Sequence, residues 1–249
     1  MIIIKTKPEI DKMKEAGKIV REALQTAGEH VAPGMTTSEL NHTIEKCITK
    51  YGARPSFKNY NGFPAASCIS PNCIVVHGIP SAKTVLHEGD IVSVDIGACL
   101  DGYHGDAART FPVGNISSEA QKLIDVTKEC FFRGAAQAVH GNRIGDIGSA
   151  VQTLAEENGY GVVRELVGHG VGKNLHEDPD VPNFGKAGHG IRLTAGMVIA
   201  IEPMINMGCK EVDFDRADGW TVRTRDRKLS AHYENTVLIT DGEPIFLTL

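Results

Sequence analysis

The sequence lacks the features that would place it in several large classes of protein. No apolar run approaches the roughly 18 residues needed to span a bilayer, so no membrane segment is expected. The six cysteines include no Cys-x-x-Cys pair, which disfavours a zinc ribbon or disulfide scaffold and favours reduced thiols. No excess of basic charge is present, since the net charge is −5, and we expect no nucleic-acid partner. The start, MIIIKTKPEIDKMKE, soon turns charged, so no signal peptide and a cytoplasmic location are expected.

The composition is that of an ordinary globular protein with amphipathic helices. Of the 249 residues, 41% are hydrophobic and 23% charged, and a chain of this length can bury a sizeable core. Apolar residues recur at helical spacing in four stretches, and Thr37 is the expected N-cap of the second. The predicted helices run over Pro8–Val31, from Thr37 to near Gly52, from Ser117 or Ser118 to Val139, and from about Ile147 to Gly159.

The second half of the chain repeats the first at a shift of 107 residues. This shift pairs Gly34 with Gly141, each at the end of a helix, and carries GDIVSVDIG onto GMVIAIEPM, so that Asp95 matches Glu202. We therefore predict one catalytic domain over residues 1–249, with an internal pseudo-repeat of about 8–112 and 117–249. Each half is a helix-helix-strand-strand unit, and Asp95 and Glu202 are expected to face each other near a pseudo-twofold axis.

The stretch IVSVDIGACLDGYHGDAART is predicted to form a hairpin that presents two acids on one face. Apolar residues alternate with small or acidic ones, and Asp101-Gly102 is a strong two-residue turn. Pairing about this turn makes Asp95 and Asp106 diagonal neighbours, with Cβ atoms up to about 7–8 Å apart. Carboxylates so placed repel each other unless cations neutralise them, although a solvated hairpin with two surface acids is an alternative.

Together with Glu202 and Glu234 in HYENTV, these acids form a candidate metal-binding set. His169, flanked by glycines in GHG, is the fifth candidate, since glycine allows close backbone approach. Oxygen donors with one imidazole suit manganese, iron or cobalt, and zinc is also compatible. Four carboxylates and a bridging hydroxide are better neutralised by two divalent ions than by one, and two such ions can activate a water and polarise a carbonyl.

Other histidines divide into two groups. His77 in VVHGIP and His176 each follow an apolar strand or a glycine-rich turn, and each is a candidate acid or hydrogen-bond donor over the metals. A buried structural histidine is the alternative for both. His104 and His232 flank acid positions and are expected to point away from them.

The ordered motifs VSVDIGACLDGYHGDAARTF, GHGVGKNLHEDP, IEPM and HYENTV together resemble type I methionine aminopeptidases, over essentially the whole chain. The resemblance implies the pita-bread fold, an α/β fold of the α+β type in which two pseudo-symmetric halves surround a mainly antiparallel curved sheet. It implies removal of the initiator methionine from nascent polypeptides when the second residue is small, by dimetal-activated hydroxide attack on the peptide carbonyl. It also implies two divalent metal ions (cobalt, manganese, iron, nickel or zinc) and one monovalent cation.

Roles follow from the resemblance position by position. Asp95 would chelate one metal, Asp106 and Glu234 would bridge both, and His169 and Glu202 would hold the other. His77 would lie near the scissile amide, His176 would stabilise the tetrahedral intermediate, and Glu202 is counted with them as catalytic. The remaining implied residues form the methionine pocket (Tyr60, Phe63, Cys68, His77 and Trp220), with His176 also contacting substrate, and a weaker monovalent-cation site (Asn72, Ile74 and Ser230).

The chain departs from its relatives at two pocket positions. Leu175 stands where relatives often have an aromatic residue, and Phe57 where some have cysteine, which concerns pocket shape rather than the reaction. A Cys-rich N-terminal extension and the insertion typical of type II enzymes are both missing, which points to the compact bacterial form.

Two other functions are compatible with such a fold. One is an Xaa-Pro aminopeptidase or prolidase, although those usually carry a separate N-terminal domain; the other is a non-catalytic peptide-binding module that has lost its metals. The expected partners are nascent polypeptides near the ribosome, with no specific nucleic acid and no membrane, and the expected state is a monomer.

Overall fold

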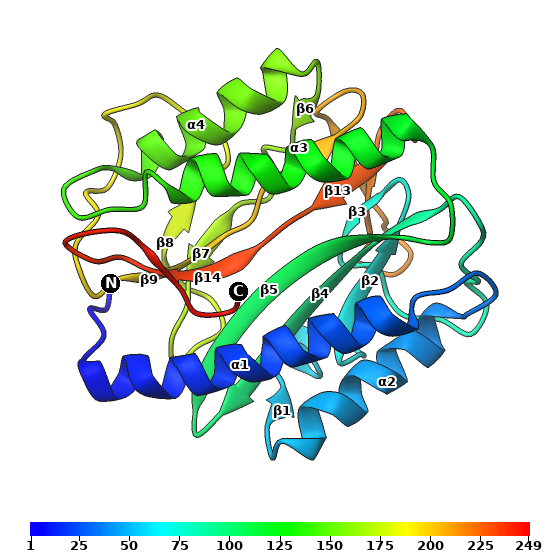
Figure 1. The fold of residues 1–249 in the computed structure, drawn as a ribbon, viewed down its shortest axis with the longest axis horizontal. Coiled ribbons are helices and arrows are strands. Elements are labelled where there is room, and N and C mark those ends of the chain that lie inside the picture. Colours follow the sequence, from blue (N-terminus) through cyan, green and yellow to red (C-terminus); the bar gives the residue numbers. More distant parts are fainter.

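Two pairs of helices lie on the outside of the molecule, with the strands between them (Figure 1). The computed structural model describes residues 1–249. Helices α1 and α2 cover the strands of the first half, and α3 and α4 cover those of the second. None of the helices combines the length and the apolar character needed to cross a bilayer. The four helices are α1 (Lys7–His30), α2 (Thr37–Lys50), α3 (Ser118–Ala135) and α4 (Ile144–Glu157).

The strands form four sheets in which every pairing is antiparallel, as predicted. The first half contributes β1 (Arg54–Pro55), β2 (Ser67–Pro71), β3 (Ile74–Val76), β4 (Ile91–Leu100) and β5 (Tyr103–Pro112), with a short 3-10 helix η1 (Tyr60–Gly62). The second half contributes β6 (Gly161–Val162), β7 (Gly168–Gly170), β8 (Glu177–Val181), β9 (Val198–Ile201), β10 (Met204–Asn206), β11 (Val212–Phe214), β12 (Val222–Thr224), β13 (Ser230–His232), β14 (Asn235–Leu238) and β15 (Ile245–Phe246). One sheet of the first half has the same arrangement as one sheet of the second half. In the first, β4 lies between β2 and β5, and in the second, β9 lies between β7 and β14.

The β4–β5 hairpin has the predicted register. Asp101 and Gly102 both have positive φ, 49° and 79°, as the two-residue turn requires, and Asp95 lies opposite Ala108. Asp106 lies opposite position 97, so the two acids are diagonal neighbours on paired strands. The predicted pairing is therefore confirmed.

Several helix ends differ from the prediction, among them the start of α4 at Ile144 rather than near Ile147, and two of the differences have a clear local cause. The N-cap of α2 is Thr36 rather than Thr37, because a capping box needs its acid at the third helical position: Glu39 N–H donates to Thr36 Oγ1 at 3.2 Å, and Thr36 N–H donates to the Glu39 carboxylate at 2.8 Å. Helix α3 ends at Ala135, short of Val139, because bonds of the i to i−3 type take over at residues 137 and 138 and tighten the backbone into turns.

The 107-residue repeat reappears in the backbone. An isolated bridge joins Thr36 to Val85, and its counterpart joins Arg143 to Arg192, each shifted by 107. Glycines related by this shift have nearly equal φ angles: 88° at Gly34 and 94° at Gly141, 76° at Gly52 and 77° at Gly159, and 91° at Gly89 and 89° at Gly196. Two pseudo-symmetric halves, and with them the predicted pita-bread architecture, are confirmed.

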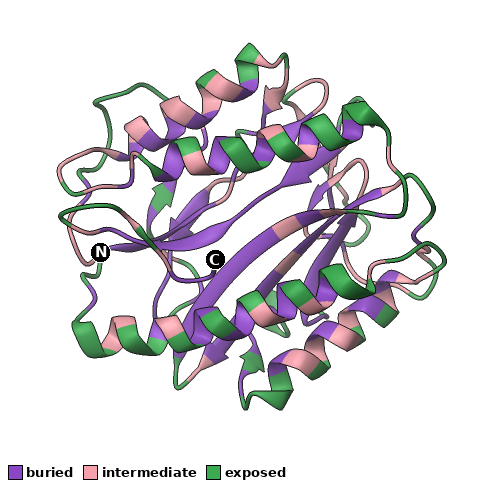
Figure 2. Ribbon diagram, viewed as in Figure 1, coloured by how far each residue is buried: buried purple, intermediate pink, exposed green.

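Each half has its own apolar core. One lies between α1, α2 and the β2–β4–β5 strands and includes Leu40, Ile44 and Val94, all fully buried. The other lies between the second helix pair and β9–β14 and includes Phe131 and Ile199. Figure 2 shows the strands between the helix pairs as almost entirely buried. Any polar group on these strands therefore needs a partner or an ion.

Candidate metal centre and substrate cavity

Four acids from the two halves line one cavity where the halves meet. Asp95 lies on β4 and Asp106 on β5, Glu202 directly follows β9, and Glu234 directly precedes β14. The N–H of Glu234 donates to Ala108 O at 3.0 Å, and the N–H of Ala108 donates to Glu234 O at 3.3 Å. These two bonds hold the start of β14 against β5, so the acids of one half are fixed against those of the other.

Without a cation, these carboxyl groups are poorly suited to carry negative charge. Burial raises the pKa of Asp95 to about 8. Burial, with repulsion from the neighbouring carboxylates, raises the pKa values of Asp106, Glu202 and Glu234 well above their usual range. The Oδ1 atoms of Asp95 and Asp106 are buried and accept no hydrogen bond. Buried oxygens without donors are suited to a divalent cation, so the residues present fit divalent metal ions.

His169 adds a nitrogen donor to this set. Its Nε2 lies 3.6 Å from Glu202 Oε1 and 3.8 Å from Asp106 Oδ2. Its Nδ1 lies 2.9 Å from Gly170 O, and an N–H donated there leaves the Nε2 lone pair free to bind a metal. Burial lowers the pKa of His169 to about 3, which keeps the ring neutral, as a metal ligand must be.

The flanking glycines explain how β7 brings His169 so close. A Cβ added at Gly168 would lie 2.3 Å from Ala200 O, and one added at Gly170 would lie 2.3 Å from Asp178 O. No other residue fits between β8 and β9 at these positions.

The expectation that His232 points away from the acids is wrong. His232 Nε2 lies 3.7 Å from Glu202 Oε2, and the buried ring has no hydrogen-bond partner at either nitrogen. Side chains two positions apart share a face of a strand, and this spacing from Glu234 was the signal that could have found it. His104 has the same two-residue spacing from Asp106 on β5, but its Nδ1 lies 2.8 Å from Ser56 Oγ, so this ring has a hydrogen-bond partner of its own. A second candidate metal-binding group is therefore Glu202, His232 and Glu234.

The cavity has a volume of about 410 Å³ and is charged on one side and apolar on the other. On β2, Cys68 lies directly opposite Asp95, so the two sides meet at that pair. The rings of Phe63 and Trp220 meet edge to face at 5.2 Å, and Trp220 also lies 6.1 Å from the ring of His77. Four of the apolar wall residues were predicted and the other two were noted as departures; together they are Tyr60, Phe63, Cys68, Trp220, Phe57 and Leu175.

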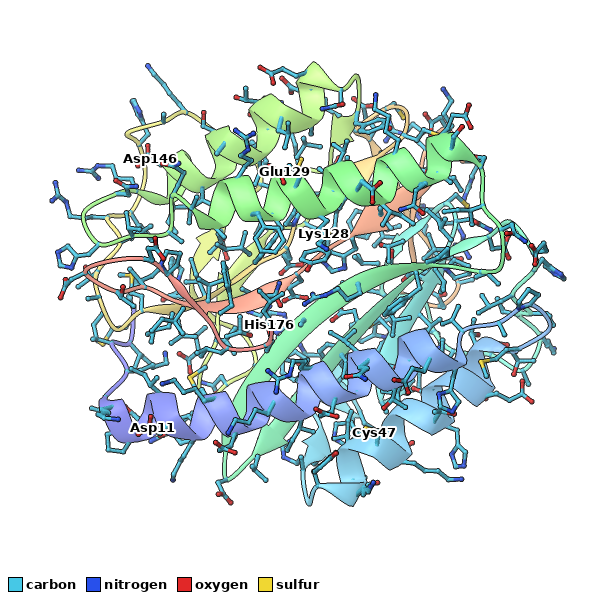
Figure 3. The ribbon with its side chains drawn as sticks, viewed as in Figure 1. Asp11, Cys47, Lys128, Glu129, Asp146 and His176 are labelled. Carbon is cyan, nitrogen blue, oxygen red and sulfur yellow. The ribbon has the colours of Figure 1, made fainter.

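His77 and His176 line the same cavity from opposite halves. His77 has φ of 58°, a left-handed conformation that is uncommon for residues other than glycine and is often found at functional sites. Burial lowers its pKa to about 4. His176 Nδ1 lies 2.9 Å from the Tyr60 hydroxyl, and its ring lies 3.9 Å from that of His169. Figure 3 labels His176 near the middle of the molecule, between the two helix pairs.

The predicted monovalent-cation residues lie near one another but make bonds of their own. Ser230 N–H donates to Asn72 O at 2.9 Å, and Ser230 Oγ donates to Asn206 Oδ1 at 2.8 Å. Ile74 pairs with Arg223 across β3 and β12. Cation binding at Asn72, Ile74 and Ser230 stays a prediction.

Known proteins share this fold and much of this sequence. The model of metallopeptidase family M24 matches residues 11–241. A methionine aminopeptidase from Clostridium acetobutylicum is 57% identical over 249 residues, which cover 100% of this chain and 99% of the relative. The crystal structure of the methionine aminopeptidase from Rickettsia prowazekii superposes with a TM-score of 0.98 at 41% identity over 100% of both chains. A prolidase from Pyrococcus furiosus gives a TM-score of 0.81 at 28% identity, over 99% of this chain and 65% of the prolidase.

The fold and the acid cluster define a metallopeptidase, and the chain belongs to metallopeptidase family M24. Within that family, the predicted resemblance to the compact type I methionine aminopeptidases is confirmed by relatives that match over the full length of both chains. Binding of divalent metal follows from the family and from the donor set.

Proposed function

We propose that this chain removes the initiator methionine from nascent polypeptides whose second residue is small. The observation that carries the proposal is a single cavity with the metal-binding acids on one side and aromatic and sulfur-bearing walls on the other. An unbranched thioether side chain suits such walls, because sulfur near aromatic edges adds about 0.3–1.5 kcal/mol to simple burial. The relatives named as methionine aminopeptidases at 57% and 41% identity support the same activity.

The donor set supports two divalent ions of cobalt, manganese, iron, nickel or zinc, held by Asp95, Asp106, His169, Glu202 and Glu234. When bound, they would supply an activated water and polarise the scissile carbonyl. By the family resemblance, Asp95 would serve one ion, His169 and Glu202 would serve the other, and Asp106 and Glu234 would be shared. The orphaned oxygens of the two aspartates support this set.

The chain's own residues would orient the substrate and move protons. His77 would donate a hydrogen bond near the scissile amide. Tyr60 would fix the His176 ring through Nδ1, leaving Nε2 to donate to the carbonyl oxygen as negative charge develops on it. The Glu202 carboxylate would accept a proton from the attacking water and pass it to the leaving amine. A second residue would have to fit between the acids and the rim of the cavity, which favours glycine, alanine or serine there.

All the groups needed for this reaction come from one chain, which supports a monomeric enzyme. Because initiator methionine occurs on newly made polypeptides, we place the action in the cytoplasm, near the ribosome. A monovalent cation at Asn72, Ile74 and Ser230 is part of the same proposal.

The test is metal-dependent release of methionine from Met-Gly-Met-Met, compared with cleavage of an Xaa-Pro peptide. We expect release of methionine only. Preferential cleavage of the Xaa-Pro peptide would favour the prolidase-type alternative, and no cleavage of either would favour a binding module. Glu202→Gln serves as the inactive control, with circular dichroism to show that its fold is kept.

A further inference from the structure

A buried ion pair between Lys5 and Glu177 takes no part in the reaction described above. Lys5 Nζ lies 2.5 Å from Glu177 Oε2, and both side chains are only 3% exposed. Every other pair of lysine or arginine with a carboxylate side chain has both members at least one-quarter exposed. Burying two charges costs desolvation energy that such a pair often fails to recover, so its presence here needs an explanation.

The pair is built into the turn that carries His176. Glu177 directly follows His176, and its Oε1 accepts the N–H of Asn174 at 3.1 Å. Asn174 O in turn accepts the N–H of Gly172 at 3.1 Å. A Cβ added at Gly172 would lie 2.5 Å from Glu177 Oε1 and 2.6 Å from Lys5 Cε, so the turn closes directly around the pair.

The other end of the pair is anchored in a different part of the fold. The N–H of Lys5 donates to Gly196 O at 2.8 Å, and the N–H of Gly196 donates to Ile239 O at 3.0 Å. Figure 1 shows the N-terminal segment running beside the start of β9, the strand that leads to Glu202. Lys5 thus connects the base of β9 to the 172–177 turn, two segments that each deliver a residue to the cavity.

We propose that Lys5, acting through Glu177, is a positioning residue that holds His176 at the reacting carbonyl. The Tyr60 hydroxyl fixes the ring at Nδ1, and the ion pair fixes the backbone that carries the ring, so the imidazole is held from both ends. A misplacement of about 1 Å in a catalytic group can cost on the order of 10²-fold in rate. The proposal rests on the proposed function for the role of His176.

The test is a set of purified variants loaded with metal, each compared with wild type for kcat and KM on Met-Gly-Met-Met. Lys5→Met should lower kcat at least about 10-fold with little change in KM or metal content, and Lys5→Arg should restore most of it, since arginine can still pair with the carboxylate. Lys7→Met is the matched control, because Lys7 lies two residues away and pairs with Asp11 on the exposed face of α1; its kcat should equal that of wild type.

Two further variants separate positioning from stability. The double variant Lys5→Met/Glu177→Gln leaves no unpaired buried charge, so it should fold. It also lacks the ion pair, so it should still show the low kcat. On the His176→Ala background, Lys5→Met should change kcat by less than about 2-fold, because the two changes act through the same ring.

Wild-type kcat in the neutral double variant, failure of that variant to fold, or a full additional loss on the His176→Ala background would each overturn the inference. An inactive wild-type enzyme would instead count against the proposed function, so the two failures are distinguishable.

Discussion

Protein stripped of metal should lose stability as the pH rises from about 6.5 to 8. The pKa of the buried Asp95 is about 8, against 3.8 for an ordinary aspartate, and the pKa values of Asp106, Glu202 and Glu234 are raised as well. In this range the folded state holds protons that the unfolded state has released. The free energy of unfolding therefore falls as the pH rises.

Buried histidines set the lower limit of this pH window. Burial lowers the pKa of His169 and of His232 to about 3 and that of His77 and of His104 to about 4, from 6.5. Below pH 6.5 the unfolded state therefore binds protons at these rings that the folded state does not bind, which opposes the carboxyl effect. Above pH 6.5 the histidine effect fades as the unfolded rings lose their remaining protons, and by about pH 7.5 only the carboxyl effect is left. For Asp95 alone, about 1.5 pH units at about 1.4 kcal/mol each amount to about 2 kcal/mol.

Urea unfolding of metal-stripped protein at pH 6.5, 7 and 8 measures this effect. An amide stays neutral throughout, so Asp95→Asn should not lose the free energy of unfolding that wild type loses through Asp95. The free energy of unfolding of the variant should therefore rise by about 2 kcal/mol relative to that of wild type between pH 6.5 and pH 8. Asp125→Asn, on the exposed surface of α3, is the control and should follow wild type. The reasoning would be refuted if the free energy of unfolding of wild type stayed level or rose over this range. It would also be refuted if that free energy changed with pH equally in wild type and in Asp95→Asn.

Four other substitutions have defined outcomes. His77→Ala and His176→Ala should each keep full metal content by atomic absorption and lose about 10²–10⁴-fold in kcat; loss of metal would make the histidine a ligand. Trp220→Ala should reduce catalytic efficiency on Met-Ala peptides and change discrimination against leucine or norleucine, as a panel varied at the first two positions would show; lower thermal stability with unchanged selectivity would mean that Trp220 only packs. Gly170→Ala should destabilise the fold by about 1–3 kcal/mol or more in urea, since its Cβ would lie 2.3 Å from Asp178 O; near-wild-type stability would show that β8 can move aside.

The features that follow local rules were predictable from sequence. The Asp101-Gly102 turn fixes its register by backbone geometry alone, so the relation of Asp95 to Asp106 followed directly. The 107-residue repeat likewise located Glu202, because shifting the sequence by 107 residues places Glu202 at the position of Asp95.

What the sequence left open depends on contacts between distant segments. Lys5 and Glu177 are 172 residues apart, and nothing local to either marks them as a pair. The end of α3 is set by how the following residues turn, which apolar periodicity does not encode. His232 was missed for a different reason, because the two-residue spacing from Glu234 was present and was not applied.

The corresponding sheets of the two halves differ in the residues that they place at the cavity, and this difference affects the orientation in which a peptide can bind. In the first half β2 presents Cys68 beside β4, whereas in the second β7 presents His169 beside β9. A centre with true twofold symmetry would accept a peptide equally well in either orientation, because its two ends would meet identical surroundings. A peptide has chemically different ends, so only a site whose symmetry is broken can bind it one way round. The differences between the two similar halves therefore allow the site to distinguish one terminus of a peptide from the other.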